Sequence, residues 1–433
     1  MSLNGPTGWD VAGGHALLIG AGGDLFNQAG EVVRYDSTGM PQGAAISTCF
    51  GGTRELAKPY IGKSWRGVMQ ASSQAAAQSL SFLAPGQLIE DPLVLGRAQG
   101  CLLGQLAGDA LGSLGEFSSP EQTAHRYPKG PSLLEEGGTW STIAGQPTDD
   151  SELALALARS IVQAGDYDAE NAAAAYARWK QSAPFDIGNT TRTALSAAAS
   201  ALQSKGSAAA AAMMVANRGS QANGALMRIS PLAIFASPLD AEVLMDMARQ
   251  DAKLTHPNEV CQDANAIFAA TVGFAIRSGS SKSEVYDYAV KLAGSGAFSE
   301  SVVSRLREAE KHPPNDFTSQ MGWVLIAFQN AFFRLLHAES VKDGVVETVC
   351  GRAVIRTPMR LRVPCSAQYM GAMRFRSSGS DRILACRPIS GLDDVKRPRP
   401  AEYWPVDVLA LAENLLVAGE KRSKRLKAQQ GGV

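Results

Sequence analysis

The pattern of apolar and polar positions changes near residue 90. Before this point, short apolar runs alternate with glycine-containing turns, as is typical of short strands. After it, alanine-rich segments with helical spacing follow one another, and few strand-like runs intervene. The pattern predicts an all-α domain of many short helices behind a small β-containing extension. We expect strands at His15–Gly20, Glu31–Tyr35 and Ala44–Thr48, and turns at Gly22-Gly23, Ser37–Gly39 and Gly51-Gly52.

The predicted domain boundaries follow from this change. We place the N-terminal extension at residues 1–88, the α-helical domain at 89–420 and a basic tail at 421–433. We interpret the tail as a solvated, frayed terminus, because chain ends often lack partners. The expected helices lie at 64–83, 97–112, 151–164, 168–181, 191–204, 207–217, 240–251, 259–279, 282–294, 299–311 and 317–337.

Glycine recurs at every fourth position of the helix expected at 97–112, at Gly100, Gly104, Gly108 and Gly112. Because glycine costs a helix about 1 kcal/mol relative to alanine, this spacing indicates close approach by another backbone. Packing inside a membrane is the other known use of the spacing. The polar residues of this helix, which include Asp109, exclude that use.

The stretch Pro147–Glu152 places Thr148, Asp149 and Asp150 side by side, directly before a run of strong helix formers. Hard cations such as Mg²⁺ and Mn²⁺ prefer oxygen ligands of this kind. A simpler interpretation is also open. Asp149 and Glu152 could form a capping box, and acids at a helix start are favoured by the helix dipole.

Three later loops carry polar residues at expected helix ends: Phe185–Thr191, Asn223–Leu232 and Leu254–Asn258. Taken singly, each loop is more typical of a turn or a cap than of a site. The same holds for Asp109 and Glu116, each of which alone would be read as a surface acid.

Composition excludes several classes of protein. The 433 residues carry a formal net charge of zero, which disfavours nucleic acid as a partner. The six cysteines form no Cys-x-x-Cys pair, which argues against a zinc site and a disulfide framework. The sequence shows neither a secretory leader nor a run of 18 apolar residues, so we expect a cytoplasmic protein without a membrane partner.

Taken together, the polar stretches resemble the ADP-ribosylglycohydrolase family, which includes the dinitrogenase-reductase-activating and ADP-ribosylarginine hydrolases. The resemblance covers about residues 95–280, where the stretches occur in the order and spacing of the family. It implies an all-α fold with two Mg²⁺ or Mn²⁺ ions and hydrolysis of the bond from ADP-ribose to a protein side chain, most often arginine. The matching stretches are Gly104–Glu116, Pro147–Glu152, Asp186–Thr191, Asn223–Leu232 and Leu254–Asn258.

The resemblance also implies roles for single residues. Thr148, Asp149 and Asp150 resemble metal ligands. Glu116 resembles the acid that lines the ribose and the metals, and Asp186 resembles the acid near the scissile bond or the arginine leaving group. The ADP-ribose site of the family includes residues similar to Asn223, Gly224 and His256.

The chain departs from the family after residue 350. The family has a second metal motif, Gly-Gly-Asp-Thr-Asp-Thr-Asn, at the position where this chain reads Gly351–Arg360. From Thr348 to Ser380 there is no Asp or Glu, but there are six arginines. Without carboxylates from this segment, the second half of the metal site is incomplete.

A shift of reading frame accounts for this segment. Codons chosen for Arg352 onward can encode Gly-Gly-Asp-Thr-Asp-Thr-Asn-Ala when they are read from their third bases. The single methionine codon limits this freedom: Met359 with Arg360 allows only Ala or Glu, and Met370 with Gly371 requires Gly. We interpret residues 351–380 as frameshifted, in the gene or in its sequencing, with real divergence as the alternative. Sequence typical of the family resumes near Asp381.

Three functions follow as hypotheses. The first is a metal-dependent hydrolase acting on an ADP-ribosylated protein, most often at arginine. The second is an immunity protein that neutralises an ADP-ribosyltransferase toxin by contact, in which residues 1–88 could bind the toxin. The third is a catalytically impaired relative, if the segment 351–380 is genuine.

Overall fold

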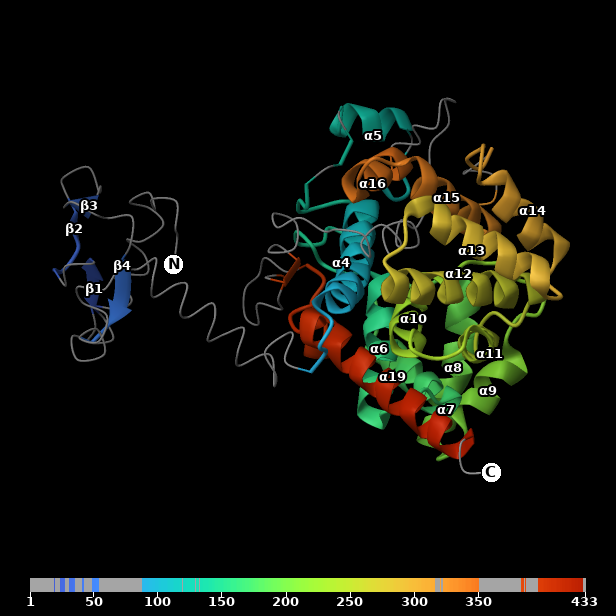
Figure 1. Cartoon of the computed structure of the whole chain (residues 1–433). Helices are drawn as coiled ribbons and strands as arrows, with labels where there is room; N and C mark the ends of the chain where they lie inside the picture. Colours follow the sequence, from blue (N-terminus) through green and yellow to red (C-terminus); the bar gives the residue numbers. More distant parts are fainter. Residues whose placement is uncertain are drawn as a thin grey trace. The chain divides into compact units, whose positions relative to one another are not determined.

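The computed structural model describes residues 24–27, 31–35, 41–42, 49–53, 88–118, 120–128, 130–131, 133–315, 322–349 and 396–430, with a few isolated positions besides. The chain divides into two compact units, Met1–Phe82 and Leu83–Val433 (Figure 1). The expected boundary at residue 88 lies six residues beyond this division.

The N-terminal unit contains two small antiparallel ladders. Strand β1 (Asp24–Asn27) pairs with β4 (Cys49–Gly52), and β2 (Arg34–Tyr35) pairs with β3 (Pro41–Gln42). The prediction of strands at 31–35 agrees with β2, whereas most of the strands expected at 15–20 and 44–48 lie outside the described residues. Gly51 and Gly52, which were expected in a turn, belong to β4, so that prediction was wrong.

The second unit is helical, as the sequence pattern predicted. Two short 3₁₀ helices, η2 (Leu226–Arg228) and η3 (Ala401–Tyr403), accompany the α-helices. The α-helices of this unit are α4 (Pro92–Gly115), α5 (Pro120–Arg126), α6 (Asp149–Ala164), α7 (Ala169–Gln181), α8 (Asn189–Gln203), α9 (Ala208–Val215), α10 (Ser230–Ala236), α11 (Ala241–Lys253), α12 (Glu259–Ser278), α13 (Lys282–Ser295), α14 (Glu300–Glu308), α15 (Val324–His337), α16 (Val341–Val349) and α19 (Val408–Gln430).

Helix α4 lies at the centre of the arrangement that carries the polar stretches. It contacts α6, α10, α12, α16 and α19, and most of its side chains from Val94 to Gly115 are buried. Helix α19 packs so closely on α10 that Gly419 has no room for a side chain. A Cβ added there would lie 1.8 Å from the Phe235 carbonyl oxygen. Segments from both ends of the unit therefore build one core (Figure 1).

Most expected helices are present with ends shifted by a few residues, but three differences change the picture. The helix expected at 317–337 begins only at Val324, because Trp323 forms a bridge with Ala222. Helices α5, α10, α16 and α19 fall where no helix was expected. The helix expected at 64–83 lies outside the described residues.

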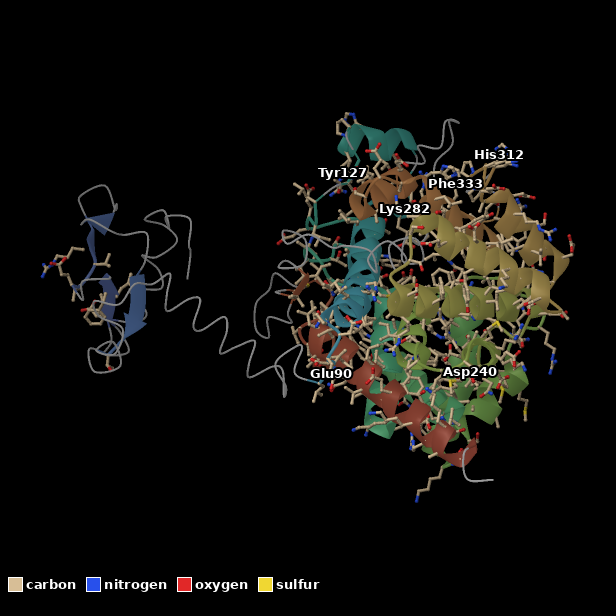
Figure 2. The ribbon with its side chains drawn as sticks, viewed as in Figure 1. Glu90, Tyr127, Asp240, Lys282, His312 and Phe333 are labelled. Atoms are coloured by element: carbon tan, nitrogen blue, oxygen red, sulfur yellow. The ribbon has the colours of Figure 1, made fainter. Side chains whose placement is uncertain are left out.

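The basic tail is not frayed. Residues 421–430 continue α19, and Arg422 forms an ion pair of 2.7 Å with Asp166 at the end of α6. Another contact between helix ends involves Lys282 at the start of α13, which is labelled in Figure 2. Its Nζ donates to the carbonyl of Ala338 after α15. None of the described helices combines the length and apolar composition that a membrane crossing needs.

Candidate functional site

The stretch of Thr148, Asp149 and Asp150 forms the buried start of α6. Thr148 is the N-cap residue, the two aspartates are the first helical residues, and no more than 3% of each residue is exposed. The Thr148 side chain makes no capping hydrogen bond within α6. Glu152 does not complete a capping box, because its carboxylate has partners on other segments. The capping-box interpretation of this stretch was therefore wrong.

Asp109 of α4 holds the start of α6 from the neighbouring helix. Its carboxylate accepts a hydrogen bond from the Thr148 backbone at 2.9 Å, from the Thr148 hydroxyl at 2.5 Å and from the Ser151 backbone at 3.2 Å. Burial raises the pKa of Asp109, and the hydrogen bonds from Thr148 oppose that rise. Asp109 is buried, so the interpretation of this residue as a surface acid was wrong.

Gln105, one turn before Asp109 on α4, joins two of the predicted stretches. Its side-chain amide donates to the carbonyl of Asp150 at 3.2 Å and to the carbonyl of Met227 at 3.0 Å. Its amide oxygen accepts from the hydroxyl of Ser230. The motif around Asp150 and the motif at 223–232 are thus fixed to the same buried side chain.

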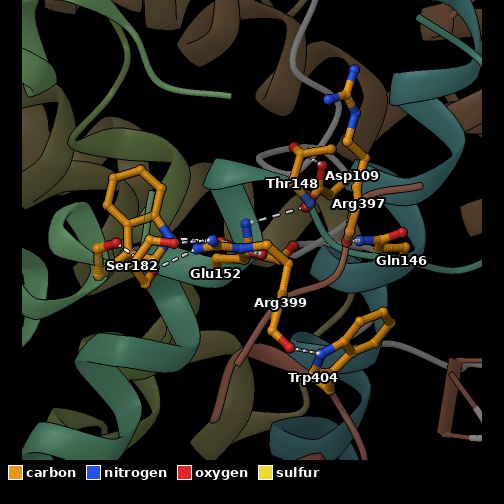
Figure 3. Close-up of polar contacts among 10 residues, drawn as sticks. Asp109, Gln146, Thr148, Glu152, Ser182, Arg397, Arg399 and Trp404 are labelled. Atoms are coloured by element: carbon orange, nitrogen blue, oxygen red, sulfur yellow. Dashed lines mark hydrogen bonds and ion pairs between the residues drawn. The ribbon is translucent and has the colours of Figure 1, made fainter. Parts of the chain in front are cut away.

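Glu152, two residues after Asp150, is clamped by a distant arginine (Figure 3). Arg399 Nε donates to Glu152 Oε1 at 2.8 Å, and Arg399 Nη2 donates to Oε2 at 2.8 Å. The indole of Trp179 donates to the same Oε2 at 2.6 Å. Burial raises the pKa of Glu152 to about 7, against the opposing effect of the Arg399 guanidinium.

Glu116 directly follows the last residue of α4 and is half-buried. Its Oε2 accepts a hydrogen bond of 2.8 Å from the indole of Trp140. The Trp140 ring also contacts Phe117 and Phe185, with ring centroids 5.8 Å apart in each pair. Because Phe185 immediately precedes Asp186, Trp140 links the segment of Glu116 to the loop of Asp186.

Asp186 is buried in the loop between α7 and α8, and Thr191 lies in the first turn of α8. Thr191 meets the two other predicted binding loops at Gly224. A Cβ added at Gly224 would lie 2.8 Å from Thr191 Oγ1 and 2.7 Å from His256 Cε1. Only a residue without a side chain leaves the imidazole in this position. The structure therefore brings Gly224, His256 and the loop of Asp186 together.

A buried network fixes these loops from behind. Arg228 of η2 donates to Asp251 Oδ2 at 3.0 Å, to the Gly224 carbonyl at 3.1 Å and to the Thr255 hydroxyl at 2.9 Å. The Thr255 hydroxyl in turn lies 2.8 Å from Nδ1 of His256. Asn223 is held separately, because its backbone N–H donates to the carbonyl of Gly322 at 2.8 Å. Both sides of the predicted binding loop are thus anchored.

The ligand chemistry of the α6 start suits a hard divalent cation, since Thr148, Asp149 and Asp150 offer only oxygen atoms. The resemblance described above predicts that they form part of a ligand set for two ions. Within the described residues, no group of three or more His, Cys, Asp or Glu side chains is arranged to hold a metal. Residues 351–380, where the family has its second metal motif, lie outside the described part of the chain.

A cavity of about 450 Å³ lies elsewhere in the helical unit. Its lining includes Arg249, Asp263 and Phe298, and none of the predicted site residues. We therefore base the site on the contacts between motifs and not on this cavity.

Four residues around the site were not predicted as part of it: Gln105, Asp109, Trp140 and Arg399. Gln105 and Asp109 lie within the matching stretch Gly104–Glu116, so their positions in that motif could have identified them as site residues. Trp140 and Arg399 had no such signal, because each acts on a residue that is distant in sequence.

Comparison with known proteins agrees with the motifs. A family model described as ADP-ribosylglycohydrolase matches residues 90–353, which is more than half of the chain. The ADP-ribosyl-[dinitrogen reductase] glycohydrolase of Rhodospirillum rubrum is 35% identical over 176 residues, 40% of this chain and 55% of that protein. The ADP-ribosylarginine hydrolase Tri1 of Pseudomonas putida (strain GB-1) is 30% identical over 205 residues, 46% of this chain and 51% of that protein. The chain thus spans about half the length of these relatives.

A solved structure described as an ADP-ribosylglycohydrolase-related protein complex has the same fold. It superposes with a TM-score of 0.55 at 21% sequence identity, covering 75% of this chain and 99% of that one.

Proposed function

Because the chain belongs to the ADP-ribosylglycohydrolase family, we propose that it is a hydrolase that removes ADP-ribose from modified protein side chains, with arginine as the linkage site. The hydrolase names of its relatives support the reaction class, and the name of the Pseudomonas putida relative supports arginine. The proposed cofactor is Mg²⁺ or Mn²⁺.

One observation carries this proposal: Thr148, Asp149 and Asp150 are buried side by side at the start of α6, and Thr148 is held there by two hydrogen bonds to Asp109. Thr148, Asp149 and Asp150 would hold the cation. When bound, such a cation would supply a water of lowered pKa and a positive charge for orienting the ribose hydroxyls.

Other residues of the chain would serve the substrate. We assign to Glu116, held by the Trp140 indole, the transfer of a proton to or from water or the leaving group. Asp186 would face the scissile bond or the guanidinium of the leaving arginine. Asn223, Gly224 and His256 would bind ADP-ribose, with the glycine leaving room beside the imidazole.

Residues 351–380 limit the hydrolytic activity that we expect of the chain as it stands. Their six arginines and lack of carboxylates would leave the second half of the ligand set empty. The match to the family model ends at residue 353, close to the start of this segment. After this segment Arg399 binds Glu152 and α19 packs on α4, as expected if the family reading frame returns. We therefore expect the chain as it stands to be a weak hydrolase, and a chain with Gly-Gly-Asp-Thr-Asp-Thr-Asn restored to be an active one.

The test is the release of ADP-ribose from a protein modified on arginine, with a serine-linked substrate as the control. The restored chain should release ADP-ribose from the arginine substrate with Mn²⁺ and lose this activity with a chelator. Failure of the restored chain on both substrates would overturn the proposal. The same assay on residues 89–433 separates hydrolysis from toxin binding by residues 1–88, because only toxin binding requires the extension.

A further inference from the structure

The C-terminal strap, residues 396–404, contacts segments next to the candidate site through Arg397 and Arg399 (Figure 3). We propose that Arg397 and Arg399 of this strap are positioning residues, which set the geometry of the Thr148–Asp150 stretch and of the loop that holds Glu116. This inference rests on the proposed function for its catalytic consequence, but its geometry is independent of any substrate.

Arg399 joins the first turn of α6 to the end of α7. Besides its paired bonds to Glu152, it donates from Nη1 to the Ser182 carbonyl and from Nη2 to the Ser182 hydroxyl, both at 2.8 Å. Glu152 lies two residues after Asp150, and Ser182 lies four residues before Asp186. One guanidinium with its planar, fixed set of donors thus sets the spacing between two predicted site loops.

Arg397 acts on the segment before α6. Its Nε donates to the Trp140 carbonyl at 2.9 Å, and its own carbonyl accepts from the Gln146 side-chain amide at 2.6 Å. Trp140 binds Glu116 through its indole, and Gln146 precedes Thr148 by two residues. The strap therefore fixes both ends of the segment that enters the metal-binding stretch.

The strap is itself held firmly. Trp404 is buried, and its indole donates to the Arg399 carbonyl at 2.9 Å. The Arg399 guanidinium lies 5.3 Å from the centre of the Tyr403 ring. Arg159 of α6 donates to the Glu402 carbonyl at 2.8 Å. Because the strap is anchored in this way, its hydrogen bonds can restrain the loops that it contacts.

Charge neutralisation is the competing explanation for Arg399, because a lone buried Glu152 would be strongly unfavourable. The double variant Glu152→Gln with Arg399→Met separates the two roles. It removes both charges, so neutralisation is no longer needed, but the link to Ser182 is also lost. Arg397→Met is a milder second variant, since Arg397 is exposed. Arg422→Met is the matched control, because it breaks an ion pair of the same C-terminal region away from the strap.

The experiment is hydrogen–deuterium exchange of the full chain, followed by titration with Mn²⁺. In the double variant, amides at 143–151 and 183–188 should exchange about tenfold faster than in the unaltered chain. The melting temperature of the control variant serves as the reference for global stability. Mn²⁺ affinity should fall about tenfold, since affinity follows the placement of the ligands. Arg397→Met should accelerate exchange at 140–146, and Arg422→Met should leave all of these segments unchanged.

Equal exchange of residues 143–151 in the unaltered chain and in both strap variants would overturn the proposal. Exchange that accelerates equally throughout α4 and α6 would also overturn it, because that result indicates a purely structural role. A motif-restored chain that releases no ADP-ribose counts against the proposed function alone, and the exchange comparison still decides the role of the strap.

Discussion

Asp109 accepts hydrogen bonds from both the backbone N–H and the hydroxyl of Thr148, at 2.9 and 2.5 Å. One carboxylate on α4 therefore fixes the orientation of the first residue of the proposed metal-binding stretch. The hydroxyl proton of Thr148 points to Asp109, which leaves the oxygen lone pairs available to a cation.

Replacement of this carboxylate should disturb both stability and metal binding. Asp109→Asn places an amide with one acceptor oxygen where three donors now converge, so at least one buried donor loses its partner. We expect the free energy of unfolding in urea to fall by about 1–3 kcal/mol. We also expect Mn²⁺ affinity to fall about tenfold.

Asp168→Asn is the matched control for this variant. Asp168 caps α7 by accepting one hydrogen bond of 2.9 Å from the Asn171 backbone, which an asparagine oxygen also accepts. Its stability and Mn²⁺ affinity should stay close to those of the unaltered chain. Equal losses in the two variants would contradict a special role for Asp109.

The close contact between Gly224 and His256 gives a second prediction. Gly224→Ala would place a Cβ 2.7 Å from the imidazole and 2.8 Å from the Thr191 hydroxyl, so both side chains must move. We expect a loss of about 1–3 kcal/mol in stability. Binding of ADP-ribose, measured by calorimetry, should weaken. Gly294→Ala in α13 is the control, because nothing lies within 4 Å of its added Cβ and the residue is not part of the site. Unchanged ADP-ribose affinity in Gly224→Ala would contradict the assigned binding loop.

Much of this arrangement could be predicted from local sequence. The helical periodicity after residue 90 and the oxygen-rich stretch at Thr148 are local patterns, and both correspond to features of the structure. The capping-box prediction failed because one distant acceptor and one distant donor replace the local hydrogen-bond partners. Asp109 takes the amides at the start of α6, and Arg399 takes the carboxylate of Glu152.

Contacts between distant positions could not be predicted in this way. Glu152 and Arg399 are 247 residues apart, and neither residue carries a local sign of the other. Trp140 likewise lay in a stretch without a recognised motif, although its indole binds Glu116. Such pairs depend on the packing of whole helices, which hydrophobic periodicity alone does not specify.

Glu170 gives a prediction for acid stability. It accepts hydrogen bonds from the Ser207 hydroxyl and from the backbone of Ala208 and Ala209 at the start of α9. Partial burial acts to raise the pKa of Glu170, but these bonds outweigh it and lower the pKa below the usual 4.5. The stabilising contribution is therefore present above pH 4.5 and is lost as the pH falls through the lowered pKa.

Glu170→Gln should accordingly be less stable than the unaltered chain near neutral pH, by about 1 kcal/mol or less because the side chain is partly solvated. The difference should shrink as the pH is lowered below 4.5. Urea denaturation of both chains across this range measures it. A stability difference that grows with acidification would show that the pKa of Glu170 is not lowered in the folded protein.

The absence of carboxylates from residues 351–380 predicts how the chain binds metal. A cation held by Thr148, Asp149 and Asp150 alone has half of the ligands that the family supplies, and affinity follows the charge and number of ligands. We expect calorimetric titration with Mn²⁺ to show at most one weak site in the chain as it stands. The motif-restored chain should show two tighter sites. Two tight sites in the unrestored chain would mean that carboxylates from elsewhere complete the centre.

The central claim is that Asp149 and Asp150 hold the cation on which hydrolysis depends. The most direct measurement is the release of ADP-ribose from modified arginine at saturating Mn²⁺, by the motif-restored chain and its variants Asp149→Ala and Asp150→Ala. Removal of either ligand disturbs the position of the cation and the activation of water. We predict that each variant loses most of the activity while keeping its helical content. Near-normal turnover by either variant would contradict the claim.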